Sequence, residues 1–420
     1  MKYSGIEWIG DMPDTWELVK IGSLFLCRNE KVNDTDYPPL SVSRGGVVPQ
    51  MENVAKSDAN DNRKLVLAGD FAINSRSDRK QSCGLSELDG SVSLINTVLY
   101  LRNKDKVYGK YLNYLLKNYG FAEEFYRWGH GIVADLWTTR WQEMKNIVLP
   151  LPIQKHQIAL TNEIEKKLEE IDRLIEIETQ QIEKLKEYKQ AVITEVVTKG
   201  LDKSAPMKDS GVDWIGEIPF DSDVVTFSSL IDNIQNGYVG PTRDLFVENG
   251  VPYIQSLHIK DGKIVFEKHE YYVREEWANK KPKIFLNNLL IVQTGDIGQV
   301  ALVDEKNNGN NCHALLIVKL KESVINPNYL CYYFRSKTGK ELLLSTKTGA
   351  LLPHLNAGRV GMTYVVVPPL SKQNDIVVEL NKKCKGIDMI IEIKQQKIEK
   401  LNEYKKSLIY EYVTGKKEVK

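Results

Sequence analysis

One stretch of the sequence occurs twice: Ile182-Glu183-Lys184-Leu185-Lys186-Glu187-Tyr188-Lys189 returns 216 residues later as Ile398-Glu399-Lys400-Leu401-Asn402-Glu403-Tyr404-Lys405. Each copy lies within a long charged segment of helical periodicity, roughly Leu160–Lys199 and Ile376–Lys416. An internal repeat of this kind indicates the architecture of a chain before its separate elements are assigned. The repeat predicts a chain of two similar halves, each containing one long helix.

Apolar residues in both segments follow a 4-3 spacing, which forms one narrow seam along a helix and is typical of coiled coils. The predicted seam positions are Ile164, Leu168, Ile171, Ile175, Glu178, Ile182 and Leu185 in the first segment, and Leu380, Ile387, Ile391, Lys394, Ile398 and Leu401 in the second. At the centre of the seam one copy has the acid Glu178 and the other has the base Lys394, which favours pairing between the two copies. The alternative is two unrelated helices, each lying on its own domain. A helix of about 40 residues is about 60 Å long, which suits a role in setting a distance.

The charges of the segments also favour pairing of the two helices. The net charge is −2 over residues 153–207 and +4 over residues 371–420, so the two helical segments attract each other. The net charge is 0 over residues 1–152 and −1 over residues 208–370. Nucleic-acid binders usually have a basic excess, so a DNA-binding role must depend on local patches or on a partner.

A second repeat opens each half of the chain. Ser4-Gly5-Ile6-Glu7-Trp8-Ile9-Gly10-Asp11-Met12-Pro13 returns as Ser210-Gly211-Val212-Asp213-Trp214-Ile215-Gly216-Glu217-Ile218-Pro219. The glycines and the proline predict turns, and Trp8 and Trp214 are each predicted to be a buried anchor. The second copy follows the end of the first helical segment closely. We therefore expect the first copy to lie beside the end of the second helix, which would bring the two termini together.

Size and composition indicate a protein of two or three domains with real cores, since 42% of the 420 residues are hydrophobic. No apolar run approaches the roughly 18 residues of a membrane span, and the N-terminus lacks the hydrophobic region of a signal peptide. We expect a cytoplasmic protein that does not enter a membrane. The five cysteines form no C-x-x-C pair and are interpreted as reduced, mostly buried thiols. Cys312 and His313 are adjacent without further ligands nearby, so no metal site is expected.

The sequence contains no catalytic motif that predicts an enzyme. G-x-G-x-x-G, GxxxxGK[ST], HExxH and G-x-S-x-G are all absent. An adenine methyltransferase would also need a glycine-rich cofactor loop and a tetrapeptide like N-P-P-Y. Asn326-Pro327-Asn328-Tyr329 is superficially close, but it lacks the second proline and precedes an expected helix. We predict no catalytic residues and interpret the chain as a binder and a spacer.

Polar and basic loops in both halves are candidates for reading DNA. Arginine donates two parallel hydrogen bonds that match guanine, glutamine can pair with adenine in the same way, and serine reaches phosphates. The candidates are Arg44, Arg76, Ser77, Arg79, Lys80, Gln81, His130, Thr138 and Arg140 in the first half, and Thr294, Gln299, Lys347, Thr348, His354 and Asn356 in the second. The alternative for each is a solvated polar loop, and the nearby Trp137 and Trp141 can equally belong to the core. Because the loops differ between the halves, we expect two different half-sites and an asymmetric target.

Several of these features together resemble one known family. The S-G-x-x-W-[IL]-G openers, the proline-led helix starts (Pro152…Gln157 and Pro369…Gln373) and the doubled helices are similar to those of specificity (S, HsdS) subunits of type I restriction–modification enzymes. The resemblance implies an α+β fold of two pseudo-symmetric α/β target-recognition domains separated by two long antiparallel coiled-coil helices. The implied boundaries are 1–152 for the first recognition domain, 153–200 for the first helix, 201–219 for the linker and repeated opener, 220–370 for the second recognition domain and 371–416 for the second helix.

The resemblance also implies a function and partners. Each recognition domain would read one half of a bipartite sequence in double-stranded DNA. The helices would dock two methyltransferase (M) subunits, which bring S-adenosylmethionine and methylate adenine, and two restriction (R) motor-nuclease subunits would use ATP and Mg. The specificity subunit itself would catalyse nothing. The helix starts depart from the family pattern, because Pro152 is not followed by an acid and Lys372 stands where an acid is common. The alternative functions are a coiled-coil scaffold or adaptor with two protein-binding ends, and a single-chain modification enzyme.

Overall fold

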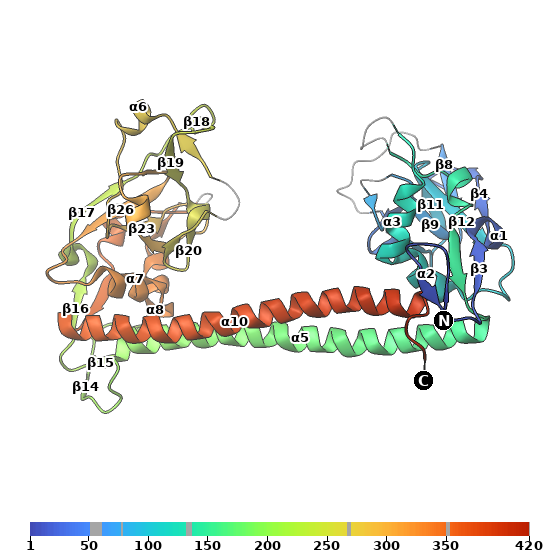
Figure 1. The fold of residues 1–420 in the computed structure, drawn as a ribbon. Coiled ribbons are helices and arrows are strands. Elements are labelled where there is room, and N and C mark those ends of the chain that lie inside the picture. The colour runs from blue at the N-terminus through green and yellow to red at the C-terminus, as the bar shows by residue number, and fades with distance from the viewer. Residues whose placement is uncertain (51–60, 77–78, 132–136, 267–269, 350–352, 420) are drawn as a thin grey trace. The chain divides into compact units, whose positions relative to one another are not determined.

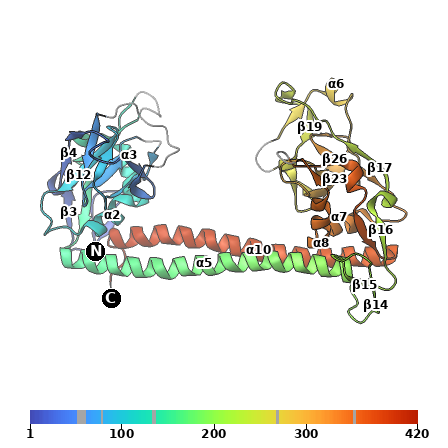
Figure 2. The same cartoon turned by 180° about the vertical axis from the view of Figure 1, so that it is seen from behind.

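The computed structural model describes residues 1–50, 61–76, 79–131, 137–266, 270–349 and 353–419. The chain divides into two compact units. Unit 1 comprises Met1–Thr179 and Gln395–Lys420, and unit 2 comprises Gln180–Lys394. Each unit contains one mixed α/β body together with a part of each long helix (Figures 1 and 2).

The two long helices, α5 (Gln154–Lys199) and α10 (Leu370–Val413), contain 46 and 44 residues. Within unit 1, Asp172 and Glu178 of α5 form ion pairs with Lys405 and Lys397 of α10. The residue numbers rise along one helix as they fall along the other, so the helices run antiparallel. Two long antiparallel helices with two α/β bodies are the fold class expected from the sequence, which the structure confirms.

The seam positions lie on the less exposed face of each helix. On α5, Ile164, Ile171, Glu178 and Ile182 are buried, and Leu168, Ile175 and Leu185 are partly buried. On α10, Leu380 and Ile387 are buried, and Ile391, Lys394, Ile398 and Leu401 are partly buried. The buried carboxylate of Glu178 accepts a hydrogen bond of 2.6 Å from Lys397, and Lys394 donates to Gln181 within unit 2. Salt bridges and hydrogen bonds therefore satisfy the polar centre of the seam.

The body of unit 1 is built on a four-stranded sheet of order β10-β9-β12-β4, beside a three-stranded sheet of order β11-β8-β5. Its elements are β1 (Lys2–Tyr3), β2 (Asp11–Met12), β3 (Glu17–Lys20), α1 (Ile21–Leu24), β4 (Phe25–Arg28), β5 (Lys31–Val32), β6 (Leu40–Ser43), β7 (Gly46–Pro49), β8 (Arg63–Val66), β9 (Phe71–Asn74), β10 (Cys83–Leu85), β11 (Gly90–Val92), β12 (Asn96–Leu101), α2 (Gly109–Lys117), α3 (Tyr119–Arg127), α4 (Trp141–Met144) and β13 (Val148–Leu151). The core between α2, α3 and the sheet continues onto Leu160 and Ile164 of α5 and Leu408 of α10.

The body of unit 2 repeats this plan with a four-stranded sheet of order β17-β26-β23-β24 and carries a second sheet of order β18-β22-β19-β25. Its elements are β14 (Met207–Asp209), β15 (Glu217–Pro219), β16 (Asp223–Thr226), η3 (Phe227–Leu230), β17 (Ile231–Asn236), β18 (Phe246–Val247), β19 (Val251–Ile254), η4 (Ser256–His258), β20 (Ile259–Lys260), β21 (Lys263–Ile264), β22 (Tyr272–Val273), α6 (Glu275–Ala278), β23 (Leu289–Val292), β24 (Val300–Leu302), η5 (Glu305–Asn307), β25 (Asn311–Cys312), β26 (Leu315–Leu320), α7 (Pro327–Arg335), α8 (Lys337–Ser345), β27 (Lys347–Thr348), β28 (His354–Leu355), α9 (Ala357–Val360) and β29 (Tyr364–Val367). The second sheet lies on the side of this body that faces away from α5 and α10 (Figure 1).

A pair of nine-residue helices follows the four-stranded sheet in each unit, and one residue joins the two helices. The joint is Asn118 between α2 and α3, and Ser336 between α7 and α8. Both joint residues have extended backbone with ψ near 160°, and both side chains accept a hydrogen bond from the backbone N–H three residues later. Such a cap satisfies one of the free N–H groups at a helix start, which explains why a polar residue stands at both joints.

A fully buried glutamine fixes the start of each long helix. Gln157 donates to the carbonyls of Pro152 and Lys106 and accepts from the N–H of Tyr108, at 2.8, 3.1 and 2.8 Å. Gln373 makes the equivalent bonds with the carbonyls of Pro368 and Val324 and the N–H of Asn326, at 2.8, 3.1 and 2.7 Å. Each glutamine thus ties the strand before the helix to the loop before the short helix pair.

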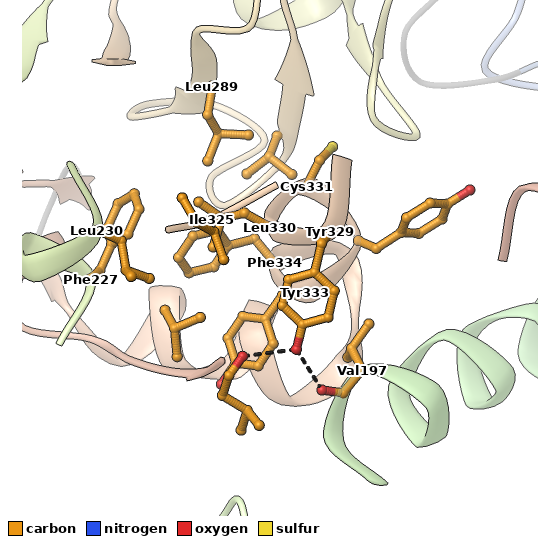
Figure 3. Packing of buried hydrophobic residues seen from close by; sticks show 14 of the residues in the cluster. Val197, Phe227, Leu230, Leu289, Ile325, Tyr329, Leu330, Cys331, Tyr333 and Phe334 are labelled. Carbon is orange, nitrogen blue, oxygen red and sulfur yellow. Dashed lines mark hydrogen bonds between the residues drawn. The ribbon is translucent and has the colours of Figure 1, made fainter. Parts of the chain in front are cut away.

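A buried tyrosine closes the same junction from the other side. In unit 2, the hydroxyl of Tyr329 lies 2.8 Å from the carbonyl of Val366 and 3.0 Å from that of Val197, near the end of α5. Both Tyr329 and Val197 belong to the core shown in Figure 3. In unit 1, the hydroxyl of Tyr111 lies 3.5 Å from the carbonyl of Pro150 and 3.3 Å from that of Val413, at the end of α10.

The opener of the chain lies against the end of α10, as the sequence predicts. Tyr410 donates a hydrogen bond of 2.8 Å to the carbonyl of Trp8, and Lys416 donates to the carbonyl of Ile9. The N-terminal strands and the C-terminal residues are therefore neighbours within unit 1. The prediction of two buried tryptophans is half wrong: Trp8 is 7% exposed, but Trp214 is 67% exposed.

The five cysteines are free thiols, and four of them are buried. Burial raises the pKa of the Cys83 and Cys312 thiols to about 12, so both stay protonated at neutral pH. Over the described part of the chain, no helix is both long enough and apolar enough to cross a membrane.

Candidate nucleic-acid interface

Three segments of unit 1 meet beyond the end of strand β9 and bring several predicted DNA-reading residues together. Backbone bridges join Arg76 to Thr138 and Thr138 to His130. The N–H of Thr139 donates 3.0 Å to the carbonyl of Ser75, which continues this connection towards Arg140. The side chains of Arg76, His130 and Arg140 are exposed here. Loops far apart in the sequence therefore form one surface with two arginines and a histidine.

Aromatic residues behind this surface hold it in place. The rings of Tyr126 and Trp137 are stacked with centroids 5.7 Å apart, and Trp137 donates a hydrogen bond of 2.9 Å to the carbonyl of Tyr126. The hydroxyl of Thr139 donates 2.7 Å to the carbonyl of Phe125. These bonds attach the loop to the last turn of α3. The sequence left open whether Trp137 belongs to the core. In the structure Trp137 is partly buried, so its ring both supports the loop and forms an edge of the surface.

Other predicted readers in unit 1 have structural partners. Lys80 pairs with Glu123 at 2.9 Å and lies 4.4 Å from the centre of the Tyr126 ring. Arg44 donates 3.3 Å to the carbonyl of Lys80, and Gln81 donates 3.3 Å to the carbonyl of Lys117. These bonds fix the loop after β9. Arg79 in this loop is exposed, and Ser77 lies outside the described residues.

Unit 2 forms the same arrangement beyond the end of strand β23. The N–H of Leu355 donates 3.1 Å to the carbonyl of Gln293, and the β27–β28 pair places Thr348 opposite His354. The hydroxyl of Thr348 lies 3.1 Å from Nε2 of His354. The side chain of Gln293 is buried and donates to Asn236 and to the carbonyl of Leu355. This glutamine anchors the hairpin to the sheet.

The remaining predicted readers of unit 2 differ in how far their side chains are engaged. Asn356 caps α9 by accepting from the N–H groups of Gly358 and Arg359 at 2.9 and 3.4 Å. Thr294 and Lys347 are exposed, whereas Gln299 is partly buried. The sequence interpretation stopped at Asn356 and missed Arg359, whose exposed side chain follows within the same short helix. The signal in the sequence that could have found Arg359 is an asparagine able to cap a helix, Asn356, followed closely by an arginine.

The hydrogen bonds put the two surfaces in register. Ser75 corresponds to Gln293 and Thr139 to Leu355, because each pair makes the same backbone bond. It follows that Arg76 corresponds to Thr294, Thr138 to His354, and Arg140 to Asn356, the residues before α4 and α9. Equivalent positions of the two units thus present different hydrogen-bonding groups.

These surfaces are suited to contact from outside rather than to engulfing a ligand. The space beneath the unit 1 loops, lined by Ser75, Lys80, Tyr126 and Trp137 among others, measures about 20 Å³, which is room for one water molecule. A nucleobase cannot enter a space of this size. Among the residues whose placement is described, no three metal-binding side chains form a cluster. The geometry therefore supports recognition of a groove edge or a backbone.

Comparison with known proteins identifies the class of this fold. Residues 221–403 match the model of the family described as type I restriction modification DNA specificity domain. The type I restriction enzyme MjaVIII specificity subunit of Methanocaldococcus jannaschii is 27% identical and aligns over 97% of this chain and 94% of its own length. The putative MjaX specificity subunit of the same organism is 24% identical over 98% of this chain and 96% of its length.

Solved structures agree at the level of the fold. A chain from a study of complex assembly in the type I R-M system superimposes with a TM-score of 0.67 at 15% identity, covering 96% of this chain and 98% of that chain. The HsdS subunit from Thermoanaerobacter tengcongensis gives a TM-score of 0.51 at 16% identity with the same coverage. The protein thus has the fold of a DNA specificity component. The matched family model and the full-length relatives confirm the resemblance, seen in the sequence, to specificity subunits of type I restriction–modification enzymes.

Proposed function

We propose that this chain reads an asymmetric, two-part DNA sequence for a type I restriction–modification complex, each recognition domain reading one half. The observation that carries this proposal is the pair of equivalent surfaces with different side chains. Arg76 in unit 1 takes the position of Thr294 in unit 2, and Thr138 takes the position of His354. A shared frame with different polar groups is what two different half-sites require.

The chemistry of the exposed groups fits the edges of base pairs. The guanidinium of Arg76 offers two parallel donors that match O6 and N7 of guanine. Threonine and histidine side chains both donate and accept single hydrogen bonds, so Thr294 and His354 suit contacts with bases or phosphates. The whole chain has a net charge of +1, so its own long-range attraction for DNA is small. Partner subunits would then supply much of the positive surface.

Exposed apolar residues on the long helices support docking of the methyltransferase subunits there. Outside the seam, Leu174 and Ile177 of α5 are 44% and 42% exposed in unit 1. In unit 2, Met389, Ile390 and Ile393 of α10 are 54%, 45% and 63% exposed. Apolar groups gathered on a helix face favour packing against another helix. The docked subunits would carry S-adenosylmethionine for adenine methylation, and motor-nuclease subunits would join with ATP and Mg.

Methylome sequencing tests the central proposal. A cell that expresses this chain with its methyltransferase partner should acquire one bipartite methylated motif. Arg76→Ala should relax the motif in one half only, with a loss of discrimination of about 10- to 100-fold at the affected base pair. Arg359→Ala should affect only the other half. Relaxation of both halves by either single substitution would contradict the assignment of one half-site to each unit.

The proposed role of the helices in setting the spacer has its own test. Deleting one heptad from α5 and the facing heptad from α10 removes about 10 Å of helix. The preferred spacer should shorten by about three base pairs, since B-DNA rises about 3.4 Å per pair. An unchanged spacer would show that the helices do not set the distance.

The scaffold alternative predicts a different response to salt. Binding of the assembled complex to duplex DNA of random sequence should weaken steeply as the salt concentration rises, because counterions are released from the phosphates. A protein-binding adaptor would show no binding to random duplex at any salt concentration, and that result would favour the alternative.

A further inference from the structure

A tight turn of unit 1, residues 93–96, lies directly beside the surface that carries Arg76. The N–H of Ser75 donates 3.4 Å to the carbonyl of Ile95, and strand β9 pairs with β12 as far as Asn96 (Figure 1). Neighbouring strands of a sheet lie about 4.8 Å apart. Ile95 is therefore one strand away from the residue that precedes Arg76.

Hydrogen bonds hold this turn in one shape. The N–H of Asn96 donates 3.1 Å to the carbonyl of Ser93, which closes a four-residue turn with Leu94 and Ile95 at its two corners. The side-chain amide of Asn96 donates to the same carbonyl and to the hydroxyl of Ser93, at 3.1 and 3.2 Å, and Asn96 is only 4% exposed. The turn is fixed from its buried end, so its corner residues are held in place before any partner binds.

Both corner side chains are apolar and exposed. Leu94 is 40% exposed and Ile95 is 38% exposed. The corners of such turns are usually Gly, Pro, Asn, Asp or Ser, which adopt the required backbone easily or bond with it. A branched apolar side chain contributes neither to the turn, and its exposed part adds nothing to the core. A contact made outside the folded chain is the better explanation of this pair.

Unit 2 has the same turn position with different chemistry. The N–H of Gln293 donates 3.3 Å to the carbonyl of Ala314, which is the bond that Ser75 makes with Ile95. Ala314 therefore takes the place of Ile95. It is small and partly buried, and His313 before it is partly buried as well. A large exposed apolar pair at this position thus belongs to unit 1 and not to unit 2.

The groups around the turn favour DNA over a protein as the partner. Lys64 donates 2.7 Å to the carbonyl of Asn96 at the base of the turn. Arg76 and Arg140 are exposed on the adjoining loops. Basic groups of this kind attract phosphates. Among the groups that base pairs present in the major groove, the C5-methyl of thymine is the apolar one, and apolar side chains recognise it by contact.

We infer that Leu94 and Ile95 contact the C5-methyl group of a thymine in the half-site read by unit 1. One strand spacing and the side chains separate the turn from the tip of Arg76 by roughly 10 Å, so this thymine lies within about three base pairs of the base that Arg76 contacts. The contact selects an A·T pair without a hydrogen bond. This inference rests on the proposed function, in which unit 1 reads one half of the DNA site.

Replacing thymine by uracil removes the methyl group and leaves the hydrogen-bonding edges of the base unchanged, so it tests this contact directly. The full-length chain, assembled with its methyltransferase partner, is titrated with duplexes that carry the methylated motif. The unit 1 half is the one that Arg76→Ala relaxes, and each of its thymines is replaced in turn by deoxyuridine. Fluorescence anisotropy gives the Kd. One replacement should weaken binding about fourfold, the effect of losing one buried methyl-sized apolar group.

The double variant Leu94→Ser/Ile95→Ser shows whether these side chains make the contact. It should bind the thymine duplex about fourfold more weakly than the wild type, and it should bind thymine and uracil duplexes equally, because the contact is already lost. Serine suits the corners of a turn, so the variant keeps the fold.

Leu88→Ser is the matched control. Leu88 is also 40% exposed in unit 1, but it lies by the start of β9, on a loop whose Ser86 carbonyl accepts from the N–H of Gly69. The opposite end of the same strand leads to Arg76. The control should keep both the affinity of the wild type and its preference for thymine.

The other outcomes overturn the inference. A unit 1 half-site without an A·T pair, or equal binding of all uracil duplexes by the wild type, would overturn it while the motif relaxed by Arg76→Ala still supports the proposed function. A thymine preference that survives in the double variant would overturn the assignment to Leu94 and Ile95. Weaker binding of the methyltransferase subunit by the double variant without DNA would show that a protein covers the turn instead. A complex that methylates no bipartite motif would overturn the proposed function itself.

Discussion

Units 1 and 2 agree at the junction between body and long helices and differ at their loops and openers. At the junction, Gln157 and Gln373 each make three hydrogen bonds with equivalent backbone groups at nearly equal distances. Beyond the four-stranded sheets, Arg76 and Thr294 occupy one equivalent position with different chemistry. A buried junction allows few solutions because every backbone group needs a partner, whereas an exposed loop has water as a partner.

The comparison also shows that similar frames can differ in completeness. The opener of unit 1 buries Trp8 and Trp16, whereas the opener of unit 2 exposes Trp214 and has Ser222 at the position of Trp16. Both openers keep the same hairpin, since the N–H groups of Ser4 and Ser210 each donate a hydrogen bond to the carbonyl of the glycine six residues later. The backbone therefore repeats while the side-chain packing does not.

The prediction with the largest expected change in the free energy of unfolding concerns the two buried glutamines. Gln157→Leu and Gln373→Leu should each lower the free energy of unfolding by about 3 kcal/mol or more, because three buried backbone groups lose their partner and each costs about 1–3 kcal/mol. Urea denaturation followed by circular dichroism measures the loss. Gln395→Leu, at an exposed position on α10, should change little. A large loss for one glutamine and a small loss for the other would show that the junctions are not equivalent.

A second test probes how closely the short helices meet at their joint. A Cβ on Gly339 would lie 2.0 Å from the carbonyl oxygen of Tyr333, whereas unit 1 has Phe121 at the third position after its joint. Gly339→Ala should therefore destabilise unit 2 by about 2–3 kcal/mol through overpacking. Gly386→Ala is the matched control, because nothing lies within 4 Å of its Cβ position on α10. It should stabilise the protein by about 0.5–1 kcal/mol, and destabilisation by both would contradict the steric explanation.

The sequence was sufficient for the frame because the frame is periodic and repeated. The doubled Ile-Glu-Lys-Leu stretch predicted both long helices, and the opener repeat predicted that residues near Trp8 lie beside the end of α10. Trp214 was wrongly predicted to be buried because its repeat motif is intact, whereas the contacts that bury Trp8 are missing around Trp214. The support of Trp8 comes from Tyr410, which is 402 residues away in the chain, whereas unit 2 has the short Thr194 at the equivalent position.

The surfaces of the two units were only partly accessible to sequence reasoning. Residue chemistry found Arg76, His130, Thr138 and Arg140, which the structure brings together. It could not show that Lys80 is held by Glu123, because that partner lies 43 residues away, on helix α3. Equally, the role of Gln293 as an anchor depends on a hairpin that forms only in the folded chain. Tertiary partners decide which polar residues remain available.

A third test asks whether the paired tyrosines contribute equally. The Tyr329 hydroxyl lies 2.8 and 3.0 Å from its two acceptors, whereas that of Tyr111 lies 3.5 and 3.3 Å from its own. Hydrogen bonds weaken as they lengthen beyond about 3 Å. Tyr329→Phe should cost about 1–1.5 kcal/mol of unfolding free energy, and Tyr111→Phe about 0.5 kcal/mol. Thermal unfolding of the two variants side by side gives the difference, and a reversed order would contradict the geometry.

The smallest expected effect concerns an ionic contact of unit 2, in which Asp261 joins the Lys189–Asp388 pair that repeats the Asp172–Lys405 pair of unit 1. Lys189 of α5 donates 2.6 Å to Asp261 in the β20–β21 turn and 2.8 Å to Asp388 of α10, and Arg335 also pairs with Asp261. Burial raises the pKa of Asp261, but the charges of Arg335 and Lys189 lower it by a larger amount. The pKa of Asp261 in the folded protein therefore lies below the ordinary value. A carboxylate with a depressed pKa stabilises the folded state above its unfolded pKa of about 3.9. That stabilisation is lost as the pH falls through the folded pKa.

Asp261→Asn should therefore lower stability by less than about 1 kcal/mol at pH 7, because the carboxylate is largely exposed and solvent screens it. Asparagine tolerates the positive φ of 46° at this position, so the substitution removes charge without straining the turn. The cost of the substitution should shrink as the pH falls below 4, since the wild-type carboxylate becomes protonated there. Urea unfolding of both proteins between pH 3 and 7, compared in the transition of unit 2, measures this convergence. A cost that stays constant across the range would assign the effect of Asp261 to turn geometry instead of charge.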